Sequence, residues 1–312
     1  MRRPQVLVIT GPTATGKTLL GINVAQAVNG EIVSADSMQI YKHMDIGTAK
    51  PTKDEMRFVT HHMIDIVSPF EDYSVARYVR EAEEKLCDIL SKGKLPVIVG
   101  GSGLYIDSLI LGRTFTSRSD SSLRKTIEAR YDSIGGDNML SELRKIDKAS
   151  ADKLFPNDKK RIVRAFEAIE GSGKPISLHD EESKAKPVKY DYIKVALSFA
   201  DRSVLYDTIN KRVDLMIANG LEQEVLSLID MGVSRSCTSM QAIGYKEMLE
   251  AILGETDIKT AIEKIKMESR RLSKRQLTWL RRDDKTKWII WEDVPDIKRG
   301  FDTIVGMINE KK

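Results

Sequence analysis

Residues 5–18 read Gln-Val-Leu-Val-Ile-Thr-Gly-Pro-Thr-Ala-Thr-Gly-Lys-Thr, an apolar run followed at once by the pattern G-x-x-x-x-G-K-T. An apolar helix pattern begins at Leu19. Strand, glycine loop and helix in this order predict a phosphate-binding loop. The glycines let the backbone curl so that successive N–H groups point inward, and the following helix adds its positive end.

Side chains of the loop add to this backbone cradle. Lys17 supplies a positive charge, and the Thr18 hydroxyl is placed to ligate a Mg²⁺ ion that bridges phosphate oxygens. The predicted diphosphate-binding residues are Gly11, Pro12, Thr13, Ala14, Thr15, Gly16, Lys17 and Thr18, with Thr18 as the metal ligand. Such donors recognise oxygens and not the group attached to them. The loop therefore fits a nucleoside triphosphate or another diphosphate.

The composition limits the class of protein. The chain has 312 residues, 41% hydrophobic and 31% charged, enough for one large domain or a domain with an insertion. No run is long enough to span a membrane, and the start of the sequence leads into a core strand rather than a signal peptide. Cys87 and Cys237 stand apart, without a disulfide framework or zinc spacing. We therefore expect a cytoplasmic protein.

Apolar runs alternate with helical patterns over much of the chain. We expect strands at 5–10, 31–35, 63–67, 95–100, 190–199 and 288–291, and helices at 18–28, 74–90, 104–111, 202–219, 221–232, 241–253 and 258–281. This alternation predicts an α/β fold, a P-loop-type parallel sheet flanked by helices. Residues 114–187 instead suggest helices at 121–133, 138–146 and 158–170. The sequence thus predicts a catalytic core of 1–113 plus 188–312 with an all-helical insertion.

Asp36 follows the second expected strand. Ligands of open α/β sheets bind at the carboxyl ends of the strands, and the phosphate loop opens on that edge. A carboxylate there can ligate Mg²⁺ through water or accept a proton from a nucleophile. The alternative is a capping role, since Asp-Ser suits a helix start. Asp65 is a weaker candidate, and ordinary packing is favoured for His61 and His62, which alternate across a strand.

A second glycine-rich turn replaces a common acidic residue. ATPases with this phosphate loop usually hold magnesium with an acid that ends an apolar strand. Here residues 95–99 run into Gly100-Gly101-Ser102-Gly103 instead. Such a turn would let another ligand approach the backbone closely.

Positive charge is concentrated near the end of the sequence. Residues 264–287 contain ten Lys or Arg and three acids, a net charge of +7, whereas the whole chain carries +4. On a helix, Arg271, Arg275 and Arg282 share one side with Trp279. A second basic cluster lies at 159–164. A charge run is often only a solvated face, but two clusters of one sign favour contact with a nucleic-acid backbone.

Several motifs together resemble those of the tRNA dimethylallyltransferase family. Beside the phosphate loop they are Asp-Ser-Met-Gln-Ile-Tyr at 36–41, Met-Asp-Ile-Gly-Thr-Ala-Lys-Pro at 44–51, and segments 100–105, 157–164, 220–221, 241–247 and 274–279. The matches occur in order over about residues 5–282. The resemblance implies transfer of a dimethylallyl group from its diphosphate to N6 of the adenosine 3′ to the tRNA anticodon.

The resemblance also implies roles for individual residues. Asp36 would be the base, with Lys17, Thr18 and Ser102 as further catalytic residues; the family usually has threonine at position 102. The implied tRNA contacts are Asp36, Ser37, Met38, Gln39, Ser102, Arg124, Lys160, Arg161, Ile162, Val163, Arg164, Gln241, Ala242, Ile243, Gly244, Tyr245, Lys246, Arg271, Lys274, Arg275, Gln276, Thr278, Trp279 and Arg281. Gln39 is expected to read adenine, because an amide can pair with both edge groups.

The implied cofactor is Mg²⁺, and the implied partners are dimethylallyl diphosphate and the tRNA anticodon stem-loop, with no protein partner and no membrane. The sequence after the last expected strand has no Cys/His zinc extension, so it resembles the short bacterial form.

Two other functions stay open. A small-molecule kinase would bind ATP under an arginine-rich lid. The missing acid at the end of the strand and the basic helix, which a small substrate does not require, disfavour this function. A non-catalytic RNA-binding GTPase-like module would leave Asp36 without a role, and the sequence has no obvious Asn-Lys-x-Asp motif.

Overall fold

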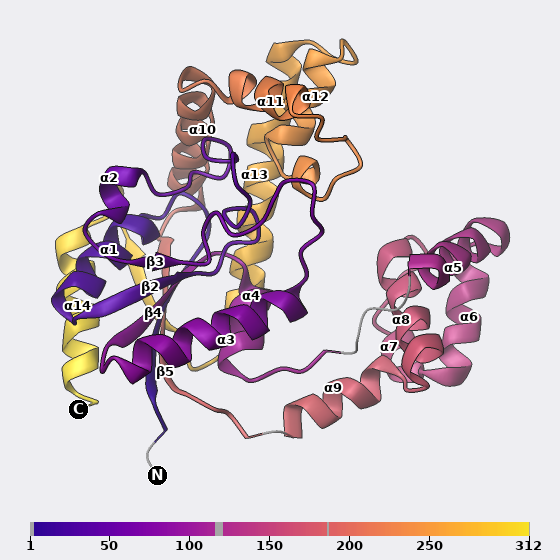
Figure 1. Cartoon of the computed structure of the whole chain (residues 1–312), viewed down its shortest axis with the longest axis horizontal. Helices are drawn as coiled ribbons and strands as arrows, with labels where there is room; N and C mark the ends of the chain where they lie inside the picture. Colours follow the sequence, from indigo (N-terminus) through magenta and orange to yellow (C-terminus); the bar gives the residue numbers. More distant parts are fainter. Residues whose placement is uncertain (1–2, 116–120, 186, 312) are drawn as a thin grey trace. The chain divides into compact units, whose positions relative to one another are not determined.

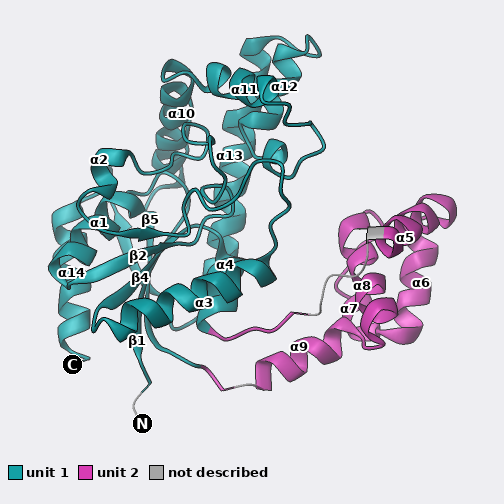
Figure 2. Ribbon diagram, in the orientation of Figure 1, with its two compact units in different colours: residues 1–110, 189–312 teal, residues 111–188 magenta. Residues whose placement is uncertain are grey.

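The computed structural model describes residues 3–115, 121–185 and 187–311 (Figure 1). They form two units (Figure 2). Unit 1 comprises Met1–Ile110 and Lys189–Lys312, and unit 2 comprises Leu111–Val188.

Unit 1 is built on a parallel sheet of six strands in the order β3-β2-β4-β1-β5-β6. The strands are β1 (Gln5–Thr10), β2 (Gly30–Ser34), β3 (His61–His62), β4 (Leu95–Gly100), β5 (Asp191–Phe199) and β6 (Lys287–Trp291). Parallel strands covered by helices are apolar almost throughout, and β1 is buried from its second residue onward. The α/β fold predicted from the sequence is confirmed.

The helices of unit 1 pack on this sheet or on one another (Figure 1). They are α1 (Lys17–Ala27), α2 (Lys53–Met56), α3 (Val75–Ser91), α4 (Gly103–Ile110), α10 (Arg202–Ala218), α11 (Leu221–Asp230), α12 (Tyr245–Ile252), α13 (Ile258–Leu280) and α14 (Ile297–Asn309). Side-chain caps start several of them: Ser74 accepts from the N–H of Arg77 in α3, and Asp257 accepts from the N–H of Thr260 in α13.

The strand expected at 63–67 is wrong. Only the preceding pair, His61–His62, joins β2. Met63 and Asp65 have φ angles of 64° and 56°, in the left-handed region, and this ends the extended run. The N–H groups of residues 66 and 67 donate instead to the carbonyl of Ile40, so the segment packs against the turn that follows Asp36.

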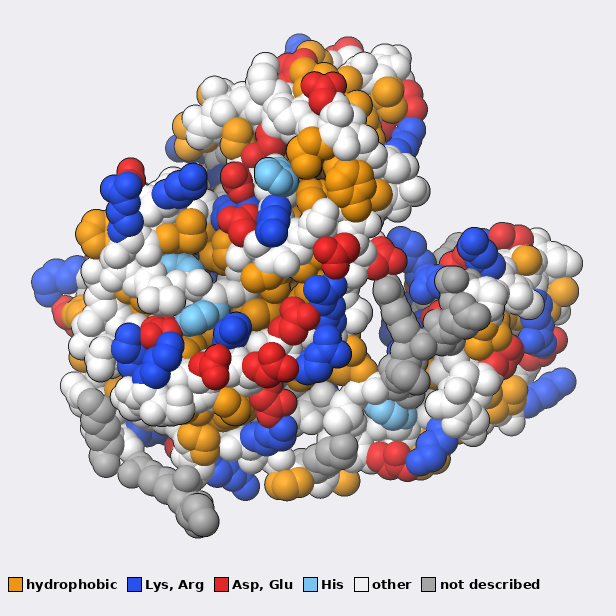
Figure 3. Space-filling model, viewed as in Figure 1, with side chains coloured by type: hydrophobic (Ala, Val, Ile, Leu, Met, Phe, Trp, Pro, Cys, Tyr) orange, Lys and Arg blue, Asp and Glu red, His pale blue; other side chains and the backbone are white. Residues whose placement is uncertain are grey.

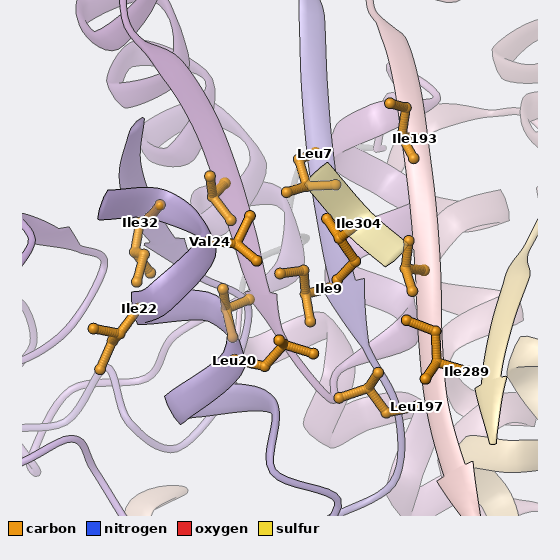
Figure 4. Close-up of a cluster of buried hydrophobic side chains, with 14 of the residues drawn as sticks. Leu7, Ile9, Leu20, Ile22, Val24, Ile32, Ile193, Leu197, Ile289 and Ile304 are labelled. Carbon is orange, nitrogen blue, oxygen red and sulfur yellow. The ribbon is translucent and has the colours of Figure 1, made fainter. Parts of the chain in front are cut away.

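The core of unit 1 lies between the sheet and its helices (Figure 4). Leu7 and Ile9 of β1 meet Leu20 of α1 and Ile304 of α14 in one buried cluster. Helix α14 was not expected from the sequence. It begins at an Asp296 cap and packs close to α1 through a glycine.

Unit 2 is helical throughout its described residues. Its helices are α5 (Ser121–Ile134), α6 (Gly136–Ile146), α7 (Lys148–Ala151), α8 (Lys159–Ser172) and α9 (Ile176–Ala185). They enclose a separate core of Ile127, Met139, Leu140, Leu143, Ala151, Ile162, Val163, Ala165 and Phe166. Across the described parts of both units, no helix combines the length and apolar character needed to cross a membrane.

Two glycines of α14 provide a matched test of its packing. A Cβ at buried Gly300 would lie 2.8 Å from Trp291 Cη2, whereas a Cβ at exposed Gly306 meets nothing within 4 Å. We expect Gly300→Ala to lower the free energy of unfolding by about 1–3 kcal/mol through overpacking. Gly306→Ala should raise it by about 0.5–1 kcal/mol, because alanine loses less backbone entropy in a helix. Urea denaturation of both variants checks this; equal effects would contradict the packing of α14.

Candidate functional site

The loop between β1 and α1 has the backbone shape that the sequence predicts. Ala14 and Gly16 have φ angles of 66° and 82°. A Cβ at Gly11 would lie 2.5 Å from the carbonyl oxygen of Leu197, so only glycine fits there. A non-glycine residue in the left-handed region costs about 1–3 kcal/mol, and such strain is common at binding sites.

Distant residues brace this loop from outside. The indole of Trp291 donates to the Thr15 carbonyl at 3.1 Å, and the Gln276 amide oxygen accepts from the Thr13 N–H at 3.1 Å. Within the loop, the Thr15 hydroxyl donates to the carbonyl of Pro12 at 2.9 Å. Contacts within the protein therefore hold the loop in this shape.

Lys17 is the cation of the loop. Its ammonium donates to the Pro12 carbonyl. The pKa of Lys17 is lowered to about 7, chiefly by burial and also by the nearby positive charge of Arg212, while the charge of Asp36 acts in the opposite direction. Lys17 is therefore near the midpoint of its titration at neutral pH.

Arg212 of α10 is a site residue that the sequence analysis missed. It lines the same cavity as Lys17 and Thr18. Burial lowers the pKa of Arg212, which the Asp36 charge partly offsets, and in the described part of the chain its Nε has no hydrogen-bond partner. A buried guanidinium in this state is a binding group for an anion. Only its spacing in the sequence could have indicated this role. Arg212 lies three residues after Ile209 and four before Met216, so the three share a helix face, and all line the cavity.

The cavity has a volume of about 320 Å³ and is lined by two kinds of residue. The polar residues include Thr13, Lys17, Thr18, Asp36, Ser37, Arg212 and Gln276, and the apolar residues include Ile209, Val213, Met216, Ile243, Ile265 and Leu272. His61 also lines it, although the sequence analysis favoured ordinary packing for that residue. The arrangement suits a ligand with a charged end and a hydrocarbon end.

Asp36 lies in this cavity, and it also has the capping role that was its alternative. Its Oδ1 accepts from the N–H of Met38 at 2.8 Å and of Gln39 at 3.4 Å. Among the described residues no hydrogen bond involves Oδ2. The next residue, Ser37, donates its N–H to the Ser102 hydroxyl at 3.1 Å, which joins the Asp36 turn to the glycine turn.

The amide of Gln39 is occupied within the protein. Its oxygen accepts from the Ser34 hydroxyl at 3.1 Å, and its nitrogen donates to the carbonyls of Thr48 and Ala49 at 3.3 and 3.2 Å. Gln39 therefore fixes the loop at 44–51. Its oxygen has a second lone pair and Gln39 lines the cavity, so the adenine-reading role stays a prediction.

A carboxylate fixes the other side of that loop. Glu224 accepts from the N–H groups of Asp45, Ile46 and Gly47 at 2.8–3.1 Å. The hydroxyl of Tyr245 also donates to Glu224. Tyr245 is fully buried, so its side chain is not available for the expected tRNA contact.

The glycine turn lies close to other parts of the chain. A Cβ at Gly100 would lie 2.2 Å from the carbonyl oxygen of Ala35, the residue after β2. A Cβ at Gly101 or Gly103 would lie 2.4 Å from Gln276 Nε2 or Trp279 Cδ1 of α13. Gly100 and Gly101 also line the cavity, and the approach of a ligand to this turn stays a prediction.

Helix α13 has an inward and an outward face. Gln276 and Trp279 point inward, and the indole N–H of Trp279 donates to Asp107, so neither has the outward position expected of a tRNA contact. Among the predicted tRNA contacts in and just after this helix, the exposed residues are Arg271, Lys274, Arg275, Thr278 and Arg281. No acidic residue occurs from 269 to 282. By contrast, basic side chains lie among acidic ones on the face shown in Figure 3.

The remaining predicted tRNA contacts fall into two groups. Ile162, Val163, Ala242 and Gly244 are buried, although Ala242 also lines the cavity. Lys160, Arg161, Gln241, Ile243 and Lys246 are exposed or partly exposed, as are Arg124 and Arg164, which lie 3.6 and 3.7 Å from the buried carboxylate of Glu167. Asp65 pairs with Lys50, and His62 with Glu31, so both serve the fold.

The donors around the loop are compatible with a magnesium ion. In the described ranges no group of three or more His, Cys, Asp or Glu side chains could hold a metal alone. The Thr18 hydroxyl and the Asp36 carboxylate offer hard oxygens in one cavity. Magnesium usually takes one or two protein ligands and fills its shell with substrate oxygens and water, so this sparse set fits it.

The lowered pKa of Lys17 predicts that the protein takes up a proton when it binds an anion. In the free protein its pKa is about 7, so at pH 8 the amine is mostly neutral. A bound anion raises that pKa, so pyrophosphate binding should take up a proton and weaken by up to about tenfold per pH unit above pH 7. Calorimetry in buffers of different ionisation enthalpy measures the uptake. Lys17→Met gives the ligand's own contribution; equal uptake in both proteins would show that Lys17 stays charged.

Comparison with known proteins identifies the family. A model described as "IPP transferase" matches residues 39–283, and one described as "Isopentenyl transferase" matches residues 4–69. A "tRNA dimethylallyltransferase" of Caldanaerobacter subterraneus is 47% identical over 291 residues, 93% of this chain and 92% of that protein.

Solved structures agree. The tRNA isopentenylpyrophosphate transferase of Bacillus halodurans is 39% identical with a TM-score of 0.73, over 99% of this chain and 98% of that one. A eukaryotic dimethylallyltransferase acting on tRNA is 29% identical with a TM-score of 0.83, over 98% of this chain and 80% of that one. By its motifs, its fold and these matches, the chain belongs to the tRNA dimethylallyltransferase family.

Proposed function

We propose that the protein transfers a dimethylallyl group from dimethylallyl diphosphate to N6 of the adenosine 3′ to a tRNA anticodon and releases diphosphate. The observation that carries this proposal is one cavity lined both by charged and polar groups, among them Lys17, Asp36 and Arg212, and by apolar side chains. Family membership supports the same reaction and does not favour the kinase alternative.

The phosphate loop and its neighbours bind the donor substrate, dimethylallyl diphosphate. The N–H groups of the loop, Lys17 and Arg212 bind the diphosphate, and the apolar side chains of the cavity take the five-carbon chain. Negative charge grows on the diphosphate as its bond to C1 of the prenyl group breaks. Fixed positive groups stabilise that charge at low cost, because they need no reorganisation. Thr18 would hold Mg²⁺, which when bound neutralises further charge on the leaving group.

Asp36 acts on the acceptor substrate, the adenine base. The adenine N6 lone pair forms the new bond to C1 as the C1–O bond breaks, and the proton of N6 passes to the Asp36 carboxylate. An exocyclic amine is a weak nucleophile until that proton has an acceptor. The hydrogen bond between Ser37 and Ser102 holds the Asp36 turn beside the glycine turn. Either threonine or serine at 102 can supply that hydroxyl.

Two exposed basic surfaces would bind the tRNA backbone, each within its own unit. One is the outward face of α13, with Lys274, Arg275 and Arg281. The other is the start of α8, with exposed Lys160 and Arg161. Recognition of a single unpaired adenosine also requires the base to leave its stack and enter the cavity.

The reaction can be tested directly. Unmodified tRNA, Mg²⁺ and dimethylallyl diphosphate should yield prenylated adenosine by mass spectrometry, without consumption of ATP. Asp36→Asn keeps an acceptor for the Met38 N–H but cannot take the proton, so turnover should fall by about 10²–10⁴-fold with little change in tRNA affinity. Phosphorylation of a small substrate by ATP, with no prenyl mass on tRNA, would establish the kinase alternative instead.

Removing positive charge from the outward face of α13 should change how strongly tRNA affinity depends on salt. Removing two phosphate contacts in Lys274→Ala/Arg275→Ala should reduce the slope of log affinity against log salt by about 1.5. Arg80→Ala/Lys298→Ala removes the same charge from exposed positions on α3 and α14 and should leave the slope almost unchanged. Filter binding at several salt concentrations measures both. Equal slopes in the two double variants would show that Lys274 and Arg275 face solvent and do not contact tRNA phosphates.

A further inference from the structure

We propose that Gln276 is a positioning residue that holds the phosphate loop and the glycine turn at a fixed separation. This rests on the proposed prenyl transfer for its catalytic consequence. Its amide oxygen accepts from the Thr13 N–H at 3.1 Å, and its amide nitrogen donates to the Gly101 carbonyl at 3.0 Å. One side chain of α13 therefore spans two loops that lie about ninety residues apart in the sequence.

The two loops have different tasks in the reaction. The phosphate loop holds the leaving group, whereas the glycine turn carries Ser102, whose hydroxyl accepts from Ser37 beside Asp36. The separation of the loops therefore sets the distance between the diphosphate and the proton acceptor. Misplacement of reacting groups by about 1 Å can lower a rate about 100-fold.

The geometry requires a glutamine amide at this position. Thr13 presents an N–H and Gly101 a carbonyl, so the bridge needs one acceptor and one donor at the same end of the side chain. Methionine has a similar length and volume but makes neither bond. Ionised glutamate lacks the donor and adds negative charge beside the cradle, whereas protonated glutamate regains an O–H donor.

The surroundings of Gln276 fit this role. A Cβ on residue 101 would lie 2.4 Å from Gln276 Nε2, so the turn has glycine where the amide approaches. Nearby, Trp279 packs against Gly103 and donates to Asp107 of α4, which anchors the same helix to the same turn. Lys194, almost fully buried, bridges Asp107 and Asp283 at 2.7 and 3.0 Å. The underside of α13 is thus attached to the turn at several points.

Three variants separate positioning from other roles. Gln276→Met and Gln276→Glu are compared with Gln26→Met, a change at an exposed glutamine of α1. For each we measure pyrophosphate affinity by calorimetry, tRNA affinity by filter binding, thermal unfolding, and kcat and KM for dimethylallyl diphosphate from pH 6 to 8.5.

We expect Gln276→Met to lower kcat about 10–100-fold and to weaken pyrophosphate binding, with tRNA affinity within about twofold of the parent. Gln276→Glu should recover activity relative to the parent as the pH falls and the new carboxyl is protonated, whereas the relative activity of Gln276→Met stays flat. Gln26→Met should match the parent throughout.

Unchanged kcat and pyrophosphate affinity in Gln276→Met would overturn the proposal. So would a loss confined to tRNA affinity, which would make Gln276 a tRNA contact. If the parent protein transfers no prenyl group, the proposed function fails, but the pyrophosphate measurements still decide whether Gln276 orders the loop.

Discussion

The site depends on one constraint: the phosphate loop must follow a tight path against the neighbouring strand. A Cβ at Gly11 would lie 2.5 Å from the carbonyl oxygen of Leu197, so only glycine allows this path. A loop of this kind has few contacts of its own, so it needs support from behind. Trp291 and Gln276 supply that support from β6 and α13. The parallel sheet, with β1 between β4 and β5, brings these distant segments to one edge.

Much of the fold could be predicted from the sequence, because buried parallel strands are continuous apolar runs. β1 and β4 have the predicted bounds. Residues 63–67 were misassigned because their apolar character serves packing against the turn after Asp36, which no local pattern shows. Helix α14 was missed for lack of a motif nearby.

The site was predicted less evenly. Motifs located the phosphate loop and Asp36, since their chemistry is local. A resemblance gives the position of a residue but not the direction of its side chain, so Trp279 and Tyr245 were assigned to tRNA although they point inward. Arg212 belongs to no motif, so only its helical spacing from apolar residues could have indicated it. Its importance lies in its place beside Lys17 in the cavity, where a bound anion would offset both positive charges.

The bond from Trp291 to the Thr15 carbonyl has a consequence for synthesis of the protein. The loop is encoded at residues 11–18, yet one of its braces lies near the end of the sequence. Translation proceeds from the N-terminus, so the first strand and its loop leave the ribosome long before Trp291 does. A nascent chain therefore carries the full motif without its finished shape. The loop gains this brace only when β6 joins the sheet.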